Sequence, residues 1–495
     1  MTNNVFCRFP KEKPCRTKIV ATLGPASESE EMIRDLILAG VDVFRLNFAH
    51  SGPAENAPVL QRIREASRQL GQPVGVLADL AGPKMRLGVI PGDERMCKTG
   101  ETLRFVRGTT TTEPDAFTTT YEPLIDDLKV KDRVLLADGT VTLEVLEKSP
   151  DAVTCRVVQG GRVRSRQGVN LPGVALSIPT IQPKDRENAI WAVGAGIDFL
   201  GLSFVRSPQD IIDLRDILEE TAAAQLGQDA WQALAPGERR IHYPNIIAKI
   251  EKPETLDCLD EIVRQADGIM VARGDLGVEV DIARIAVIQK EIIETCREFT
   301  KPVIVATQML ESMTEETIPT RAEATDVANA IFDGTDACML SGETAVGKHP
   351  VLAVETMNRI ARETEKSLRM IDGGFSLYDE TEAAYAMTGE ELPMDVKISI
   401  AVCDSAGQLA DTVEAAMILV ATKTGRTALN FSKMRNFVMT VGTSHSIEVL
   451  RRMSLYWGVI PVGGISSAPS DMLETVVRLG KESQSLAAGD RVVLT

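Results

Sequence analysis

The chain has 495 residues, 44% of them hydrophobic and 25% charged, and a formal net charge of −16. This length exceeds what one hydrophobic core supports, so we expect about two to four domains. The negative charge argues against a general binder of nucleic acid or of anionic membranes, and no apolar run is long enough to span a bilayer. Residues 1–18 lack the apolar core of a signal peptide, so we expect a cytoplasmic protein with reduced thiols.

Eight β-branched, apolar runs, most of them followed by a helical pattern, extend from residue 17 to residue 342. A strand–helix–strand unit of this length predicts two parallel strands joined by a right-handed crossover. Eight such units close into a barrel more readily than they form an open sheet, so we predict an α/β fold with a (β/α)8 TIM barrel. The runs are 17–24, 41–48, 74–80, 197–204, 245–250, 267–272, 302–308 and 336–342.

Local signals mark the ends of some of the helices between these runs. Ser27 with Glu30 and Thr320 with Glu323 have the spacing of capping boxes, which predicts a helix start at each pair. Pro253 suits the first turn of the helix predicted for 253–266. The eight cysteines include no CxxC pair and the four histidines lie far apart, which predicts no structural zinc site.

Two insertions interrupt the barrel pattern. Residues 84–183 hold short β-rich runs punctuated by glycines, which predicts a small β-rich lid domain after the third strand. Residues 221–244 predict a helical excursion plus loop whose function the sequence does not reveal. After residue 370, four further strand-like runs predict a C-terminal α/β domain, and the acidic, weakly patterned stretch 372–395 is interpreted as a linker or a mobile surface segment. The predicted bounds are 1–16 for an N-terminal tail, 17–83 and 184–370 for the barrel, 84–183 for the lid and 371–495 for the C-terminal domain.

Polar side chains stand at the ends of seven of the eight barrel runs. Barrels of this type place their chemistry at the C-terminal ends of the strands. One polar strand end would indicate only a solvated loop, but seven that converge on one rim predict a site. The side chains are Arg45, Asn47, Asp79, Ser203, Lys249, Glu251, Arg273, Asp275, Thr307, Gln308, Ser341 and Glu343.

Two carboxylates on neighbouring strands predict a magnesium site. Lys249 and Glu251 are two residues apart and share one face of their strand, and Asp275 follows the next strand. Mg²⁺ favours oxygen ligands and binds through one or two carboxylates plus substrate phosphates. The alternative is a Lys249–Glu251 ion pair with Asp275 capping a turn.

Cationic residues at the same rim favour the metal site over that alternative. Arg45, Arg86, Lys249 and Arg273 are more cations than two carboxylates need as partners. A phosphorylated acid together with a metal ion accounts for both signs of charge, and phosphoryl transfer uses this combination. The "GDLG" stretch 274–277 predicts a short helix whose N–H groups could hold a substrate carboxylate. Its "RGD" tripeptide also occurs in adhesion proteins, but here it follows a buried strand.

Several stretches resemble the pyruvate kinase family. They include "TKIVATLGPAS", "VFRLNFAHSG", "MVARGDLGVE", "ATQMLESM" and "ATKTGRTA", and they extend roughly from Thr17 to Ala428. The resemblance implies a barrel with a lid inserted after strand three and a C-terminal domain. It implies Mg²⁺-dependent transfer of the phosphoryl group of phosphoenolpyruvate to ADP, giving pyruvate and ATP in glycolysis, with Mn²⁺ as a substitute metal. It also implies a cytoplasmic homotetramer.

The resemblance assigns roles to individual residues. It implies that Arg45, Lys249 and Thr307 are catalytic and that Glu251 and Asp275 hold Mg²⁺. Thr307 stands near the carbon that gains a proton, and the proton donor is left open. The remaining assignments are Gly274 and Asp275 at the substrate carboxylate, and Arg86, Asn47 and Arg166 at the nucleotide.

One departure from the family concerns potassium. Asn47 and Asp79 match two K⁺ ligands of K⁺-dependent members, but the serine position is Ala49. The stretch "DLAGPKMR" carries Lys84 where those members have glutamate, and it resembles the K⁺-independent subgroup. An ammonium at Lys84 can supply the positive field of a bound cation, so we expect no K⁺ requirement. The alternative is an exposed hinge lysine.

Two further departures concern ligand binding. Gln167 replaces a lysine that reaches the nucleotide in relatives, with Arg166 beside it. The stretch "TKTGRT" resembles a loop that holds an effector phosphate, although it also fits an ordinary strand-to-helix turn. The chain ends at "GDRVVLT" without a further hairpin, so we expect an altered or absent response to sugar phosphates. The candidate effector residues are Thr422, Thr424, Gly425, Arg426 and Thr427.

Two other functions stay open at this point. A Mg²⁺-dependent TIM-barrel lyase or aldolase acting on pyruvate or phosphoenolpyruvate would use similar carboxylates and an arginine. A catalytically silent metabolite sensor would use the C-terminal domain alone. The lid and Arg86 favour the kinase over the lyase, and the intact Lys249, Glu251, Asp275 and Thr307 argue against the sensor.

Overall fold

The eight predicted barrel runs form a closed parallel barrel. In this computed structural model, which describes residues 15–49, 51–371, 377–387, 391–463 and 469–495, the strand order is β1-β16-β15-β14-β13-β12-β3-β2. Each strand lies within its predicted run, so the predicted fold class is confirmed. The strands are β1 (Lys18–Thr22), β2 (Val43–Asn47), β3 (Gly75–Asp79), β12 (Phe199–Leu202), β13 (Asn245–Ile250), β14 (Gly268–Ala272), β15 (Val303–Ala306) and β16 (Ala337–Leu340).

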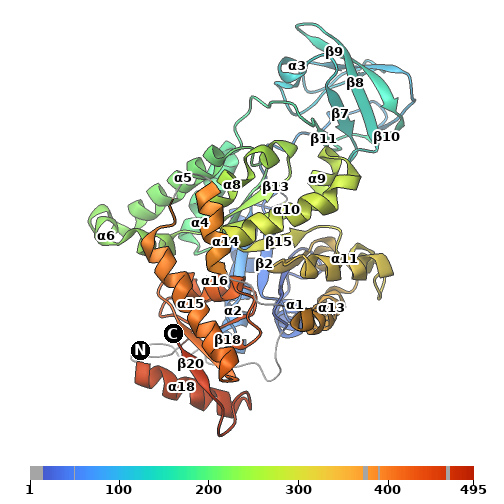
Figure 1. The fold of residues 1–495 in the computed structure, drawn as a ribbon. Coiled ribbons are helices and arrows are strands. Elements are labelled where there is room, and N and C mark those ends of the chain that lie inside the picture. Colours follow the sequence, from blue (N-terminus) through green and yellow to red (C-terminus); the bar gives the residue numbers. More distant parts are fainter. Residues whose placement is uncertain (1–14, 50, 372–376, 388–390, 464–468) are drawn as a thin grey trace.

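Helices surround the barrel because each presents an apolar face to the strands (Figure 1). The longer ones are α1 (Glu30–Ala39), α2 (Pro53–Leu70), α4 (Pro183–Gly194), α5 (Pro208–Leu226), α8 (Leu259–Gln265), α10 (Ile285–Glu298), α11 (Arg321–Phe332) and α13 (Pro350–Ile371). Short helical turns occupy the rim. They are η2 (Pro253–Cys258), α9 (Arg273–Glu279), η3 (Ile282–Arg284), η4 (Glu311–Thr314) and α12 (Gly342–Ala345). The helix predicted from Pro253 therefore begins as a 3₁₀ turn and becomes α-helical at Leu259.

One of the two predicted capping boxes is wrong. Helix α1 begins at Glu30, and its N-cap is Ser29, whose hydroxyl accepts from the Met32 N–H at 3.2 Å. Ser27 instead accepts from the Gly24 N–H at 3.2 Å, in the turn that follows β1. The Thr320–Glu323 box at the start of α11 is confirmed by hydrogen bonds in both directions.

The inserted body forms a mainly antiparallel β structure that projects from the barrel (Figure 1). Its six-stranded sheet has the order β11-β7-β8-β9-β5-β6, and β10 pairs with β4. Phe105 and Phe117 pack in its separate core with ring centroids 5.9 Å apart. The elements are β4 (Glu94–Cys97), β5 (Thr102–Val106), β6 (Ala116–Phe117), α3 (Leu124–Asp127), β7 (Arg133–Leu136), β8 (Val141–Lys148), β9 (Ala152–Gln159), β10 (Gly161–Arg164) and β11 (Val169–Asn170).

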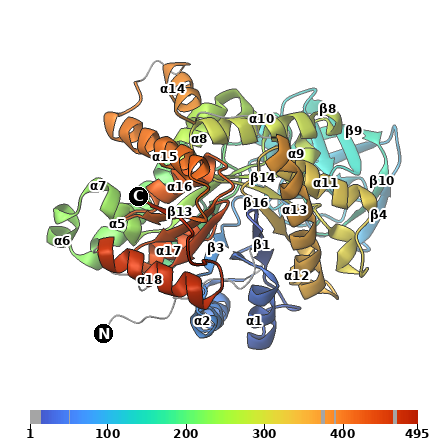
Figure 2. The same cartoon turned by 60° about the horizontal axis from the view of Figure 1, so that its bottom comes forward.

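The C-terminal body is a parallel α/β sheet of order β19-β18-β17-β20, and it lies below the barrel in Figure 1 and comes forward in Figure 2. Lys18, which opens β1, donates to the Val459 carbonyl of this body at 2.9 Å, so the body covers the N-terminal end of the barrel, away from the predicted rim. Its elements are α15 (Met394–Thr412), β17 (Met417–Ala421), α16 (Arg426–Lys433), β18 (Met439–Thr443), α17 (Ile447–Met453), β19 (Val459–Val462), α18 (Pro469–Glu482) and β20 (Val492–Leu494).

The stretch interpreted as a linker contains a packed helix. Residues 372–376 and 388–390 lie outside the described residues, but Leu377–Met387 forms α14. Leu377 is fully buried, and the Tyr385 ring packs on Phe299 at 5.9 Å. The linker interpretation is therefore wrong for α14, because a few apolar residues in an acidic stretch suffice to dock it.

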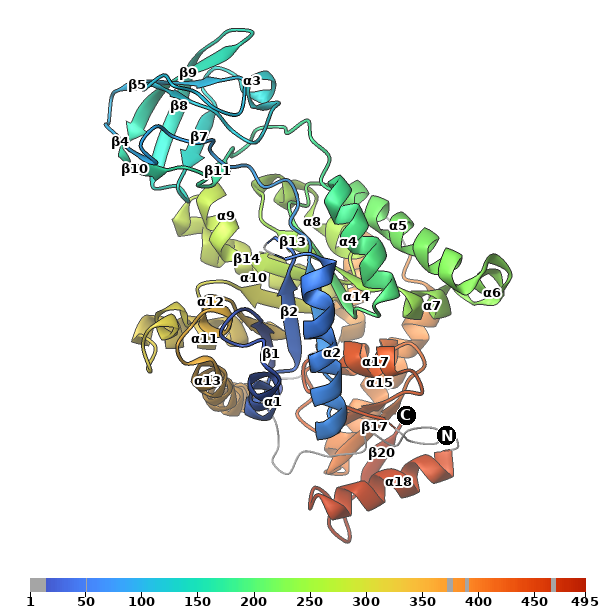
Figure 3. The same ribbon diagram turned by 180° about the vertical axis from the view of Figure 1, so that it is seen from behind.

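The second insertion is helical, as predicted. Helix α5 extends to Leu226, and α6 (Gln228–Ala233), α7 (Pro236–Arg239) and η1 (Arg240–His242) follow before β13 (Figure 3). Across the described ranges, none of the helices combines the length and apolar character that a membrane span requires.

Candidate active site

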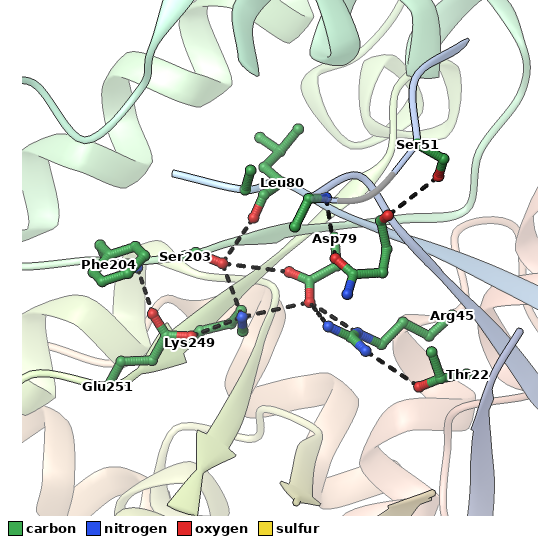
Figure 4. Close-up of polar contacts among 12 residues, drawn as sticks. Thr22, Arg45, Ser51, Asp79, Leu80, Ser203, Phe204, Lys249 and Glu251 are labelled. Atoms are coloured by element: carbon green, nitrogen blue, oxygen red, sulfur yellow. Dashed lines mark hydrogen bonds and ion pairs between the residues drawn. The ribbon is translucent and has the colours of Figure 1, made fainter. Parts of the chain in front are cut away.

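Lys249 lies at the centre of a polar cluster at the C-terminal ends of β3, β12 and β13 (Figure 4). Its Nζ lies 2.7 Å from Glu251 Oε1, donates to Ser203 Oγ at 2.8 Å and lies 3.4 Å from Asp79 Oδ2. The Lys249 side chain is 10% exposed, so one face of the cluster meets solvent. Lys249 and Glu251 thus share a face, as their spacing predicts.

The cluster keeps Lys249 charged. Burial works against the charged form, but the carboxylates of Asp79 and Glu251 outweigh it and hold the pKa of Lys249 above its ordinary value. A fixed ammonium at this position can neutralise negative charge that develops on a substrate oxygen.

Asp79 orients two cations at once. Arg45 Nε and Nη2 donate to Asp79 Oδ2 at 2.8 and 2.5 Å, and Arg45 Nη1 donates to Thr22 Oγ1 at 3.2 Å. Burial opposes the charged form of Asp79, yet Lys249 and Arg45 hold the pKa of its carboxyl below the ordinary value. Arg45 is 13% exposed, so its guanidinium reaches the rim with its orientation set.

Glu251 and Asp275 form a pair of carboxylates with different surroundings. Glu251 Oε2 accepts from the Phe204 N–H at 2.8 Å, and the side chain is 2% exposed. Asp275, in the first turn of α9, is exposed, and within the part of the chain that the structure describes it makes no hydrogen bond or ion pair. Burial raises the pKa of Glu251; Lys249 lowers it and the charge of Asp275 raises it, so the two carboxylates act on each other.

This donor set fits a magnesium ion. Among the described residues, no group of three or more His, Cys, Asp or Glu side chains is placed to hold a metal by itself. Mg²⁺ is commonly bound by one or two carboxylates, with water and substrate oxygens completing its shell.

Thr307 closes the next side of the rim in a strained conformation. Its φ is +66°, a value that a β-branched residue rarely adopts. The φ of Gln308 is also positive, at +54°. Thr307 Oγ1 accepts from the Gly274 N–H at 2.7 Å and donates to the Ala306 carbonyl at 2.6 Å. A Cβ on Gly274 would lie 3.2 Å from Thr307 Oγ1, so a side chain there would disturb this contact.

Arg273 stabilises that strained turn rather than serving as a cation of the rim. Its Nη2 donates to the Thr307 and Gln308 carbonyls at 2.8 and 3.2 Å, and its Nη1 pairs with Asp326 at 2.8 Å. The side chain is 6% exposed. Arg273, which the sequence placed among the cations around the rim, thus has its partners on α11 and on the loop after β15.

Comparisons with known proteins agree with this geometry. Residues 14–354 match the family described as pyruvate kinase, barrel domain, and residues 400–495 match the pyruvate kinase alpha/beta domain. A pyruvate kinase of Bacillus licheniformis is 38% identical over 483 residues, which cover 97% of this chain and 77% of that protein. The chain belongs to the pyruvate kinase family.

Two further pyruvate kinases resemble the chain over nearly their whole length. One from Mycobacterium intracellulare is 39% identical, with 97% of this chain and 94% of that protein covered. The crystal structure of one from Cryptosporidium parvum superimposes with a TM-score of 0.86 at 33% identity, covering 97% of this chain and 93% of that one. The pyruvate kinase family generally uses Mg²⁺, which agrees with the donor set of Glu251 and Asp275.

Lys84 is exposed, and the charged groups of the rim influence its pKa. Partial burial of the ammonium lowers the pKa of Lys84; Lys249 and Arg86 lower it further, and Asp79 and Asp275 oppose them. Within the described ranges its Nζ makes no hydrogen bond or ion pair. The ammonium therefore acts on the central cluster through space.

The predicted nucleotide residues lie at the base of the lid and at the end of β2. Arg86 Nη1 donates to the Arg166 carbonyl at 3.1 Å, and Arg166 has a φ of +64°. Gln167 Oε1 accepts from the Arg164 N–H at 2.6 Å. Asn47 Oδ1 accepts from the Ala49 N–H at 3.1 Å, which shapes the turn after β2. Their nucleotide and potassium roles stay predictions.

Ser203 and Phe204 also belong to the cluster. The sequence placed Ser203 at the rim but assigned no role to either residue. Ser203 Oγ accepts from Lys249 and donates to the Leu80 carbonyl at 2.8 Å. Phe204, with a φ of +57°, donates its N–H to Glu251. The sequence signal was their place directly after β12, next to β13 in the barrel.

The candidate effector loop lies on the C-terminal body. Thr422 Oγ1 accepts from the Gly425 N–H at 2.9 Å, and Gly425, with a φ of +91°, is the N-cap of α16. Arg426 pairs with Asp395 at 3.7 Å. This is the geometry of a strand-to-helix turn, and effector binding there stays a prediction for Thr424 and Thr427 as well.

Proposed function

We propose that this chain performs its phosphoryl transfer at the Lys249 cluster, moving the phosphoryl group of phosphoenolpyruvate to ADP and giving pyruvate and ATP. Family membership over nearly the whole chain makes it a phosphotransferase of the pyruvate kinase class. The observation that carries the location is Lys249, held charged between Asp79, Glu251 and Ser203.

Two cations receive the substrate phosphate in this proposal. Arg45 presents its guanidinium with its orientation set by Asp79, and Lys249 contributes a compact ammonium beside it. As the bond to the phosphate breaks, negative charge develops on the phosphoryl oxygens and on the enolate oxygen of pyruvate. Lys249 stabilises that charge without having to reorganise, because Asp79, Glu251 and Ser203 already orient it.

Glu251 and Asp275 would hold Mg²⁺, with Mn²⁺ as a substitute. The ion supplies positive charge that neutralises the phosphoryl oxygens during transfer. Glu251 must be ionised for this purpose, and Lys249 favours that form against the effect of burial. Asp275 is exposed, so its side chain can turn toward a ligand.

The substrate carboxylate would lie at the start of α9. The N–H groups of a first helical turn lack intrahelical partners and favour anions. Since the Gly274 N–H already donates to Thr307, the Asp275 N–H is the better candidate for this contact. Thr307 then stands beside the reacting carbon, and the donor of the final proton is not assigned.

Coupling pyruvate formation to lactate dehydrogenase tests this function. We expect NADH oxidation that requires phosphoenolpyruvate, ADP and Mg²⁺ together. A lyase or aldolase would form pyruvate without ADP, and a silent sensor would form none. Pyruvate formation that is independent of ADP would overturn the proposal.

We further infer that the chain works without K⁺, because Lys84 places a positive charge near Asp79 and Asp275. Activity in tetramethylammonium buffer is the direct measurement, and the expected rate matches that in KCl. Negligible activity that rises steeply with KCl would contradict this inference. A homotetramer is a further expectation from the family resemblance, whereas the cytoplasmic location and the domain bounds are expectations from the sequence pattern.

A further inference from the structure

Within the insertion 221–244, residues 228–242 form α6, α7 and η1 around the buried Trp231. Trp231 is 7% exposed, and its ring packs against His242 and Tyr243 with centroids 6.5 and 6.4 Å away. The Arg239 guanidinium lies 5.5 Å from the Trp231 ring, and Tyr243 Oη donates to Glu219 at 2.7 Å. These contacts pack the insertion against Glu219 of α5 and Tyr243 before β13. We call residues 228–242 the platform.

Arg452 of the C-terminal body holds this platform. From α17 its guanidinium donates to the carbonyls of Arg240 at 2.6 Å, Ile241 at 3.2 Å and Tyr243 at 2.6 Å. The Arg452 residue is 5% exposed, and burial lowers its pKa. A buried guanidinium tolerates this position because three carbonyls accept from it, so removing those partners would be costly.

The platform presents Glu238 to the candidate effector loop. The Glu238 carboxylate forms an ion pair with Lys423, the second residue of the loop 422–427. Its Oε2 accepts from the Ala235 N–H at 3.0 Å, which fixes the side chain at the start of α7. A Cβ on Gly237 would lie 3.8 Å from Thr424 Cγ2, so the backbone of the insertion borders the loop as well.

We propose that the insertion is an internal ligand of the loop 422–427, with Glu238 occupying the place that a phosphorylated effector would take. This inference rests on the proposed assignment of that loop as a phosphate-binding turn. A phosphate dianion would meet a carboxylate already paired with Lys423 and would be repelled by it. Arg452 holds the carbonyl of Arg240 two residues later, which anchors the backbone that carries Glu238.

The insertion also leads directly into the strand that carries Lys249. Arg240 pairs with Asp267, and Asp267 Oδ2 accepts from the Ile246 N–H at 2.9 Å, at the start of β13. Displacing the insertion would therefore disturb the base of β13. In the proposal, the insertion holds the start of β13 in the same conformation with and without sugar phosphates.

Calorimetry with fructose 1,6-bisphosphate tests the inference. The variant is Glu238→Gln, and the matched control is Glu220→Gln, which removes the same charge from α5, where Glu220 is 75% exposed and pairs with Arg186 rather than with the loop. We expect no detectable binding to the wild type or to Glu220→Gln. For Glu238→Gln we expect a Kd at least about tenfold below the weakest Kd that the titration detects. Arg452→Gln, which frees the insertion but keeps Glu238, should also gain binding.

Two outcomes would overturn the inference. One is binding to the wild type as tight as to Glu238→Gln, and the other is no binding to any of the four proteins. Pyruvate formation is measured on the same samples. The expected binding pattern without any turnover would support the internal ligand and overturn the proposed function, so the two failures are distinguishable.

Discussion

At the scale of single residues, the site depends on charges that hold one another in place. Asp79 accepts from Arg45 and lies 3.4 Å from Lys249, so one buried carboxylate orients the two cations proposed for the substrate phosphate. The strain at Thr307 belongs to the same scale, since Arg273 stabilises an unfavourable backbone conformation next to the reacting groups.

Replacing Lys249 by methionine should abolish most turnover. We expect Lys249→Met to lower kcat by about 10²-fold to 10³-fold or more, because a fixed charge facing the developing anion is lost. Mn²⁺ binding, followed by electron paramagnetic resonance, should persist because Glu251 and Asp275 are unchanged. Lys290→Met is the control, since Lys290 is 62% exposed on α10 and pairs with Asp333. Unchanged turnover would remove Lys249 from its proposed role.

Replacing Lys84 should create a need for K⁺. In tetramethylammonium buffer we expect Lys84→Gln to lose about tenfold or more in kcat, because the positive field near Asp79 and Asp275 disappears. Added KCl should restore part of that loss in the variant and change the wild type little. If the variant and the wild type respond to KCl alike, the ammonium does not replace a cation.

At the scale of elements, a polar contact beside the proposed metal site joins the lid to the barrel. Asn170 Nδ2 of β11 donates to Glu279 Oε1 at 3.3 Å, and the same oxygen lies 2.7 Å from Lys252 Nζ. The side chains of Lys252 and Glu279 are 3% and 1% exposed, so this pair gives the lid a fixed point at the end of α9. Lys252 directly follows Glu251, which places the contact beside the proposed metal site.

Breaking the lid contact should weaken nucleotide binding more than substrate binding. We expect Asn170→Ala to raise the KM for ADP about threefold to tenfold, the effect of losing one hydrogen bond to a charged acceptor. The KM for phosphoenolpyruvate should change less, since the substrate lies on the barrel. Gln159→Ala, which removes a bond within the lid to the Thr140 carbonyl, is the matched control. Equal changes in both KM values would contradict the assignment.

At the scale of the whole molecule, a buried ion pair joins the C-terminal body to the barrel. Lys433 of α16 lies 2.6 Å from Asp336, which precedes β16, and their side chains are 1% and 0% exposed. Arg435 approaches the other Asp336 oxygen at 3.2 Å, and its guanidinium stacks on Trp457. Burial lowers the pKa of Lys433 in spite of Asp336, so the pair depends on close geometry.

Removing one partner of that pair should destabilise the protein. We expect Lys433→Met to cost about 3 kcal/mol, because the buried Asp336 carboxylate would lose the cation nearest to it and keep Arg435 and the Val303 N–H. The midpoint of urea unfolding measures the effect. The double variant with Asp336→Asn should recover part of the loss, since it removes the carboxylate that Lys433 no longer neutralises. A midpoint equal to that of the wild type would show that the pair does not stabilise the interface.

The pH dependence of stability should carry the signature of Lys301. Burial lowers its pKa to about 8 from 10.5, while its Nζ donates to the Arg264 and Ala266 carbonyls. Between these values the unfolded chain binds the proton that the folded chain has released, so this group makes stability rise with pH across that interval and adds nothing below it. Lys301→Met should remove this contribution, which the difference between the two unfolding curves from pH 7 to pH 10 measures. Parallel curves would contradict the shift.

The sequence by itself determined the barrel, the lid insertion and the rim. Apolar runs that recur between helical patterns allow few other folds, and a polar residue at the end of a run must lie at the common C-terminal edge. Lys249 and Glu251 were predictable as neighbours because two residues on one strand share a face.

Only the tertiary structure decided which charges face the rim and how the bodies are joined. Arg273 and Lys84 both looked like cations near strand ends, but Arg273 pairs with Asp326, 53 residues away, and Lys84 meets the rim charges through space. The contact of Arg452 with Arg240 spans 212 residues. A local pattern sets periodicity and capping, whereas the partner of a buried charge depends on which distant segments the barrel brings together.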